Sequence, residues 1–352
     1  MKIQCLGAVL SAGVALSAPC ALADARPDDH APIGVMGDHY HQAGEFMFSY
    51  RFMHMSMEGN RDGTSSISAN EIVTEAANPF ANPPMMPPTL RVVPLEMEMD
   101  MHMLGLMYAP SDRLTLALMT NYTELTMSHR TYQGPVGTQP LGTFTTRTSG
   151  LSDTSLTGLV PVYETHNHRV HVTAGVSFPT GDIEERDMVL APTGARPTLR
   201  LPYPMQLGSG TYDLITGLTY AGFADRYSWG AQWRGTFRLG ENDEDYTLGD
   251  MHELSAWVSR RLGQAVSVSA RVAYGHRGNI DGMDPLIRAP VQTADPDRQG
   301  YDRVDLGVGV NFHPEGSSHR LALEVLAPLH QDLDGPQLEQ DWRLTLGWQF
   351  TP

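Results

Sequence analysis

The chain has 352 residues, a formal net charge of -16 and a mean hydropathy of -0.27. Its acidic balance argues against nucleic-acid binding, because contacts to phosphates need lysine and arginine. No run of about 18 apolar residues occurs, which excludes a helical membrane protein. A transmembrane β-barrel stays open, since its strands need only every second residue to be apolar.

The first 23 residues have the pattern of a secretory signal peptide. Lys2 precedes an apolar run from about Cys5 to Leu16, and Ala21-Leu22-Ala23 matches a small-residue cleavage site. Cys20 offers a lipoprotein as the alternative, but the three residues before it match a lipobox poorly. Cleavage would remove both cysteines, so we expect an exported chain without disulfides or thiolate metal ligands.

Residues 24 to 44 are polar and are interrupted by Pro27, Pro32, Gly34 and Gly37. We expect a lead-in segment on the periplasmic side, because proline and glycine at these intervals mark loops rather than strands. Residues 45 to 352 are then predicted to form the barrel.

The first predicted strand covers residues 46 to 57, and its even positions from Phe46 to Phe52 are all aromatic. Its odd positions carry Arg51 and several methionines. Successive side chains of a strand point to opposite faces, so the aromatic face should meet lipid and the other face the lumen. Residues 58 to 92 are polar and rich in proline, as expected for an external loop.

Short turns and long loops alternate through the rest of the chain. Further strands are predicted near residues 93–108, 114–126, 152–163, 169–178, 211–222, 228–239, 251–261, 264–275, 302–312, 320–330 and 341–350. Long loops are predicted near residues 129–149, 179–210, 240–250, 277–300 and 331–340. This pattern predicts an all-β, transmembrane antiparallel β-barrel of about twelve strands, with short turns facing the periplasm.

The last predicted strand shows the alternation most clearly. From Trp342 to Phe350 every even position is apolar, whereas the odd positions carry arginine, threonine, glycine and glutamine. Aromatic residues stand near both ends of this strand, as in the girdles of membrane barrels. A soluble sandwich is the alternative, but recurring arginines on the polar faces favour the barrel.

The polar faces carry charged residues that would point into the lumen and set the field and width of a pore. These candidate pore-lining residues are Arg51, Asp213, Arg234, Arg238, Arg271, Arg303, Asp305, Glu324 and Arg343.

Three short motifs resemble a known family. Residues 150–153 read Gly-Leu-Ser-Asp, residues 178–182 read Phe-Pro-Thr-Gly-Asp, and residues 207–214 read Leu-Gly-Ser-Gly-Thr-Tyr-Asp-Leu. They resemble outer-membrane proteins grouped as the MetA-pathway of phenol degradation family, over most of the chain from about the fourth strand onward. The resemblance implies a bacterial outer-membrane barrel that passes small molecules such as aromatic compounds. The first half departs from that family because it is rich in methionine and histidine.

Methionine alternates with acidic residues and histidine between positions 96 and 103. If Leu104, Leu106 and Tyr108 meet lipid, these methionines line the interior; the opposite register would place them in lipid. Thioether sulfur is a soft ligand that suits Cu(I) or Ag(I). Alternatively, methionine serves only as a flexible apolar filler. The candidate metal ligands of this kind are Met53, Met55, Met57, Met97, Met99, Met101 and Met103.

The lead-in segment holds a second cluster, made of His30, Met36, Asp38, His39 and His41. In an extended chain His39 and His41 project to the same side, and imidazole binds copper, zinc or nickel. Both are therefore candidate metal ligands. Since no third ligand is fixed by the spacing, a solvated polar segment is the alternative.

No nucleophile elbow, phosphate loop, dinucleotide fingerprint or zinc-protease motif occurs, and no spacing selects a catalytic triad, so we expect no enzyme. We expect a protein of the bacterial outer membrane that passes small solutes, among them hydrophobic or aromatic organic molecules. Its expected partners are membrane lipid and the solute, without nucleic acid or a resident cofactor. The alternative is a barrel that handles copper or silver and binds Cu(I) at the methionine and histidine residues named above.

Overall fold

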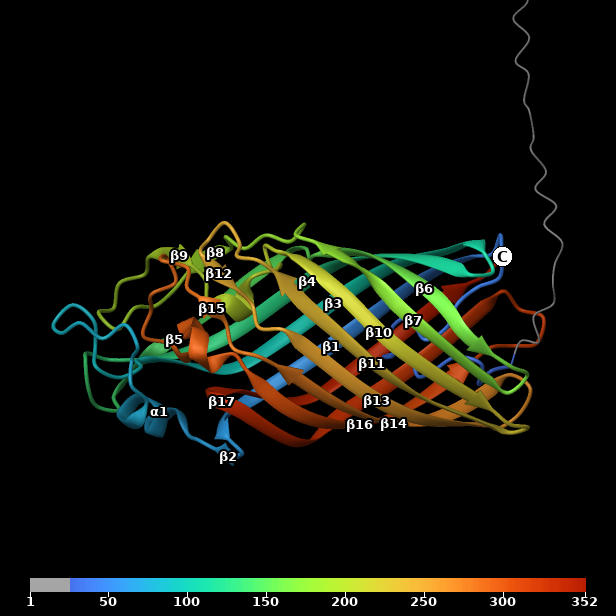
Figure 1. Ribbon diagram of the computed structural model, residues 1–352. Coiled ribbons are helices and arrows are strands. Elements are labelled where there is room, and N and C mark those ends of the chain that lie inside the picture. Colours follow the sequence, from blue (N-terminus) through green and yellow to red (C-terminus); the bar gives the residue numbers. More distant parts are fainter. Residues whose placement is uncertain (1–25) are drawn as a thin grey trace, which may run out of the picture.

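A computed structural model describes residues 26–352, and eleven of its strands form one closed antiparallel barrel (Figure 1). The predicted signal peptide, with both cysteines, lies outside the described residues. The sheet closes where β17 pairs with β1, which confirms the predicted all-β barrel. In chain order the barrel strands are β1 (Phe46–Gly63), β3 (Val92–Ser111), β4 (Leu114–Tyr132), β6 (Thr154–Glu164), β7 (His168–Phe178), β10 (Tyr212–Phe223), β11 (Tyr227–Leu239), β13 (Met251–Arg261), β14 (Val266–Arg277), β16 (Tyr301–Phe312) and β17 (His319–Phe350).

The last strand, β17, crosses the barrel twice. Its residues 321–333 pair with β16 and its residues 338–350 pair with β1, both antiparallel. A ring in which all neighbours are antiparallel closes only with an even number of segments, so β17 has to reverse within the ring. It does so around Gly335, whose φ of 78° favours glycine. The wall therefore has about twelve segments, as predicted, whereas the predicted loop over residues 331–340 is wrong because β17 continues through it.

The other elements lie in the long loops, which gather at one end of the barrel, the long-loop end (Figure 1). The chain end at Pro352 lies at the opposite, short-turn end. None of the helices in the described part of the chain is long and apolar enough to cross a membrane. The loop elements are β2 (Ser65–Ser66), α1 (Ala69–Glu75), β5 (Pro140–Leu151), β8 (Arg186–Met188), β9 (Thr198–Arg200), η1 (Tyr203–Met205), β12 (Tyr246–Thr247), β15 (Asp281–Gly282), η2 (Gln292–Ala294) and η3 (Pro296–Arg298).

Strand β5 corrects a second expectation. The predicted loop over residues 129–149 is wrong for most of its length, because β4 extends to Tyr132 and β5 begins at Pro140 and pairs with it. This part of the sheet stands beyond the apolar band, where neither face has to meet lipid. Its sequence therefore lacks the alternation that identifies a membrane strand.

The outer surface of the barrel is apolar. In β17 the side chains of Trp342, Leu346 and Trp348 are exposed on the outer face, whereas Thr345 and Gln349 between them are buried. This confirms the predicted faces of the last strand. A closed antiparallel barrel with an apolar outer band is the architecture of an outer-membrane protein.

Candidate functional site: the barrel interior

Residues 26–45, here called the luminal segment, include most of the predicted lead-in. Residues 27–41 lie inside the barrel, and residues 42–44 are exposed at its mouth. Side chains of five different strands bond to the backbone of the segment, all at the short-turn end. Thr115 Oγ1 accepts from the N–H of His41, and Glu324 Oε2 accepts from the N–H of Gly34. Three wall side chains donate to backbone carbonyls of the segment. His171 donates to the carbonyl of Gly37 and Gln232 to that of Met36, both at 2.9 Å, and Ser267 donates to that of Pro27 at 2.7 Å.

The luminal segment enters and leaves the barrel through the same mouth. At its start the Arg26 guanidinium donates to the carbonyl of Ala224, which lies in the short turn after β10. Near its end the N–H of Gly44 donates to the carbonyl of Ala109 at 2.8 Å. The wall residues it contacts all lie within about five residues of the short-turn end of their strands, a depth of roughly 13 Å for tilted strands.

Apolar side chains hold the luminal segment against the wall. Ile33 and Val35 are 2% and 1% exposed. Val35 packs with Ala31 against Trp257 of β13. Ile33 lies against Gly347 of β17, where an added Cβ would come within 2.5 Å of its side chain. Full burial of each large aliphatic side chain contributes about 1.5–3 kcal/mol, so the segment is packed and not merely enclosed.

The nine predicted pore-lining residues all project to the inner face of the barrel. Arg271 and Glu324 form a fully buried ion pair, with the guanidinium Nε 2.9 Å from Oε1. Arg303 Nε lies 3.0 Å from Asp305 Oδ1. Nearer the long-loop end, Arg238 pairs with Asp213; the other three, Arg51, Arg234 and Arg343, form no ion pair with any described residue.

Several inward charged residues were not predicted, among them Arg320 and Glu253. Arg320 donates to Asn311 at 2.7 Å and to the carbonyl of Ala31 at 2.9 Å, which ties the luminal segment to β17. Glu253 on β13 lies opposite Arg234 and 3.5 Å from Arg271. The sequence contains a signal for Arg320, because it shares the parity of Glu324 on the same strand.

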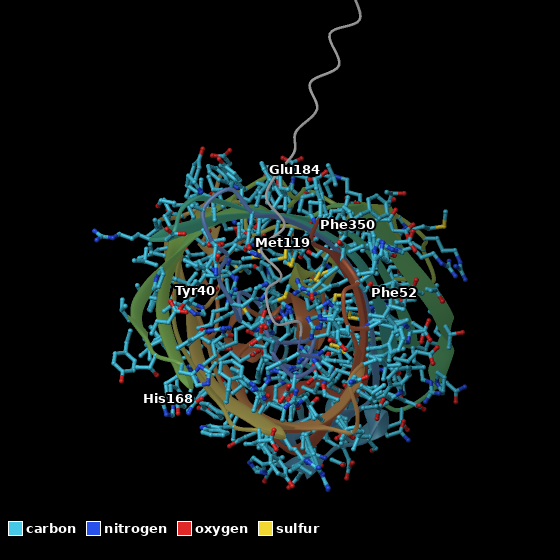
Figure 2. All side chains as sticks on the ribbon, turned by 90° about the vertical axis from the view of Figure 1, so that its right-hand side faces the viewer. Tyr40, Phe52, Met119, His168, Glu184 and Phe350 are labelled. Carbon is cyan, nitrogen blue, oxygen red and sulfur yellow. The ribbon has the colours of Figure 1, made fainter. Side chains whose placement is uncertain are left out.

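The methionines of β1 and β3 line one side of the lumen. Leu104 and Tyr108 are exposed on the outer face, whereas Met97 and Met103 on the opposite face are buried. Methionines of the two strands stand directly opposite one another, at spacings that bring Cβ atoms within about 5.5 Å. These cross-strand pairs are Met53 with Met101, Met55 with Met99, and Met57 with Met97. Figure 2 shows sulfur atoms gathered inside the ring of strands, with Met119 of β4 among the interior side chains.

The inward methionines of β1 and β3, here called the methionine wall, are covered by the long loops only near the long-loop end. Met57, Met97 and Met99 belong to an apolar cluster with Met127 and with Met205 of η1. These methionines therefore serve in packing beneath the loop of residues 179–210. Met53, Met55 and Met101 lie nearer the short-turn end, are half-buried and are not part of that cluster.

A polar cluster within the luminal segment joins three side chains. His30 Nδ1 lies 3.2 Å from His39 Nδ1, and His39 Nδ1 lies 2.8 Å from Asp38 Oδ1. Burial lowers the pKa of His30 well below its usual value. Burial alone would raise the pKa of Asp38, but the neighbouring His39 and His30 hold it well below its usual value. A negative carboxylate thus faces two imidazole nitrogens.

His41 lies beside this cluster without joining it. Its ring centroid is 5.0 Å from that of His39, but its Nδ1 lies 3.3 Å from Glu45 Oε2. Its Nε2 is buried and has no hydrogen-bond partner among the described residues. The backbone carbonyl of Met36 accepts a hydrogen bond from Gln232 of the wall. The sequence singled out His39 and His41, whereas the fold brings His30 and Asp38 to His39.

The three glycine-rich motifs named above meet at one carboxylate. Asp153 accepts the N–H of Gly181 at 3.0 Å and the N–H of Ser209 at 2.8 Å. Gly181 and Gly208 lie so close that a Cβ on either would strike the backbone of the other. The motifs thus join the start of β6 to the long loop that follows β7, and Gly181 and Gly208 are required by their close approach.

Comparison with known proteins supports the fold. No family model matches the sequence, and no curated protein matches it significantly. A solved outer membrane channel from Pseudomonas putida F1 has a TM-score of 0.57 and 13% identity, covering 90% of this chain and 99% of that chain. The toluene transporter TodX from Pseudomonas putida gives 0.41 and 10%, covering 88% and 89% of the two chains. The chain therefore shares the fold of the first structure, while the resemblance to the phenol-degradation family stays a prediction from the motifs.

Proposed function

We propose that this barrel is a channel for small organic solutes and that the luminal segment closes it at the short-turn end. The observation that carries the proposal is that the inner wall combines a row of methionines on β1 and β3 with inward arginines. The solved structure whose fold it shares is described as an outer membrane channel, which supports the same assignment.

This combination favours a particular solute. Between the luminal segment and the long loops, half-buried methionines of β1 and β3 line the lumen. Arg234 and Arg303 project inward from β11 and β16, and Arg343 of β17 stands directly opposite Met55 on the neighbouring strand. Thioethers adapt to apolar and aromatic surfaces, whereas guanidinium groups bind carboxylates and stack on rings. The favoured solute is a small molecule with an aromatic or aliphatic body and an anionic group.

The test is conductance in a planar bilayer, with the intact protein compared with a variant that lacks residues 26–43. We expect low conductance from the intact protein and a large, steady conductance from the deletion variant, with selectivity for anions. Arg234→Gln and Arg343→Gln in the deletion background should weaken that selectivity, whereas Arg113→Gln in a short turn should not. A deletion variant that folds and conducts no more than the intact protein would contradict the proposal.

A second candidate function is the handling of soft metal ions, favoured by the cross-strand methionine pairs. Met53 and Met101, which both lie outside the apolar cluster under the long loop, and Met55, which pairs with Met99 at its edge, place thioethers on adjacent strands as Cu(I) or Ag(I) would require. Changing Met53, Met55 and Met101 to leucine should then abolish stoichiometric Ag(I) uptake, while Met85→Leu in an exposed loop should not. Conductance that Ag(I) leaves untouched, without uptake, would reject this candidate.

A further inference from the structure

We propose that the luminal segment binds one divalent transition-metal ion of the Zn2+ class through His30, Asp38 and His39. The ligand atoms would be Nδ1 of each histidine and the carboxylate of Asp38. This site is separate from the methionine wall and uses harder ligands, so it does not depend on either function proposed above.

The spacing of the ligand atoms fits a small ion. In a tetrahedral zinc site with bonds of about 2.0–2.1 Å, two ligand atoms stand roughly 3.3–3.4 Å apart. The two Nδ1 atoms are 3.2 Å apart, the carboxylate lies 2.8 Å from His39 Nδ1, and its other oxygen lies 3.6 Å from His30 Nδ1. All three ligand atoms lie within 4.8 Å of one another. They therefore surround a common point at nearly the required distances.

Hydrogen bonding alone leaves this cluster incompletely satisfied. If His39 Nδ1 carries a proton, that proton faces Asp38 at 2.8 Å and leaves His30 Nδ1 to share it at 3.2 Å. If His30 Nδ1 carries the proton instead, the bare nitrogen of His39 faces a carboxylate. If both Nδ1 atoms carry protons, the two N–H groups stand 3.2 Å apart and that of His30 reaches Asp38 only at 3.6 Å. A single cation instead accepts the lone pairs of all three side chains.

The backbone fixes the ligands before an ion arrives. The segment turns between Pro32 and Gly37, where the N–H of Val35 donates to the Pro32 carbonyl at 2.9 Å and Gly37 has a φ of 63°. This turn brings His30 back to face His39. The N–H of Ala31 also donates to Asp38 Oδ2 at 2.9 Å, which holds the carboxylate in place.

Access and charge are both compatible with an ion. The side chains of His30 and His39 are 18% and 13% exposed, so the centre is sheltered but reachable. Arg320, which bonds to Ala31, opposes a cation, and the carboxylate of Asp38 offsets that charge. Two imidazoles and one carboxylate leave coordination positions open for water or a solute group.

The test uses the refolded full-length protein and Zn2+ in competition with a chromophoric chelator. We expect one tight site per chain. His30→Gln and His39→Gln should each weaken it at least about tenfold, because each removes a ligand. His41→Gln is the matched control, since His41 is adjacent but bonded to Glu45, and it should change the affinity less than about threefold.

Two further measurements keep the result interpretable. Asp38→Asn can still accept the Ala31 N–H, so it should preserve the fold and lose the metal. Co2+ in place of Zn2+ should give the visible absorption of a tetrahedral ion, which His39→Gln should abolish. No stoichiometric binding, or binding that survives both His30→Gln and His39→Gln in folded protein, would overturn the proposal. Neither readout involves conductance, so failure here and failure of the channel proposal are distinguishable.

Discussion

The buried pair of Arg271 and Glu324 shows what can be read from sequence at the scale of single residues. Strand alternation places both side chains in the lumen, because each shares the parity of polar neighbours on its strand. Alternation does not predict that the two side chains meet, because β16 lies between β14 and β17. The ion pair forms inside the lumen, across the inner face of β16. The face of a residue is local information, whereas its partner depends on the closed barrel.

This pair should be important for stability. Glu324→Gln leaves the fully buried Arg271 without its main counter-charge, and breaking a buried pair costs about 3–5 kcal/mol. The matched control is Glu184→Gln, because Glu184 is 57% exposed and its buried partner Arg200 keeps two other counter-charges, Glu244 and Asp284. We expect the control to cost less than about 1 kcal/mol. Urea unfolding in lipid vesicles, followed by tryptophan fluorescence, measures both, and equal losses would contradict the argument.

At the scale of elements, the sequence identifies the strands that cross the membrane and misses the structure beyond it. The predicted first strand ends at residue 57, but β1 continues to Gly63, where lipid no longer imposes alternation. The luminal segment shows a different limit. Its proline and glycine content correctly indicates irregular structure, but nothing local distinguishes a loop inside a barrel from one outside it. Only contacts with distant strands place it in the lumen.

Gly34 is the position at which the luminal segment is most sensitive to substitution. A Cβ there would collide with the carboxylate of Glu324 and the guanidinium of Arg271, a pair that cannot separate cheaply. Gly34→Phe should therefore expel the segment and raise bilayer conductance toward that of the deletion variant. Gly263→Phe is the control, because nothing lies within 4 Å of a Cβ there. Unchanged conductance of a folded Gly34→Phe variant would show that the segment can remain in place.

At the scale of the whole molecule, the apolar outer band is the feature that sequence predicts best. It arises from a rule that holds for every membrane strand, so errors at strand ends do not disturb it. The even number of wall segments follows from antiparallel closure, although the reversal in β17 was predicted as a loop of ten residues rather than as continuous strand.

The outer band makes a direct prediction for stability in lipid. Leu218 lies in the middle of β10 and is 49% exposed on the outer face. Leu218→Arg should destabilise the barrel by about 2–4 kcal/mol, because a charge near the bilayer midplane loses its hydration. Val136→Arg, at an exposed loop position, should stay within about 0.5 kcal/mol. Guanidinium titrations in vesicles compare the two, and an equal effect would argue that Leu218 does not face lipid.

The path of the luminal segment bears on how the barrel could open. Both of its ends lie at the short-turn mouth, with Arg26 beside one turn and Glu45 directly before β1. Withdrawing it therefore requires no chain terminus to thread through the pore. This topology permits the segment to leave the lumen as a loop while it stays attached to the barrel at Phe46. It also permits the segment to return to the same position without unfolding the wall.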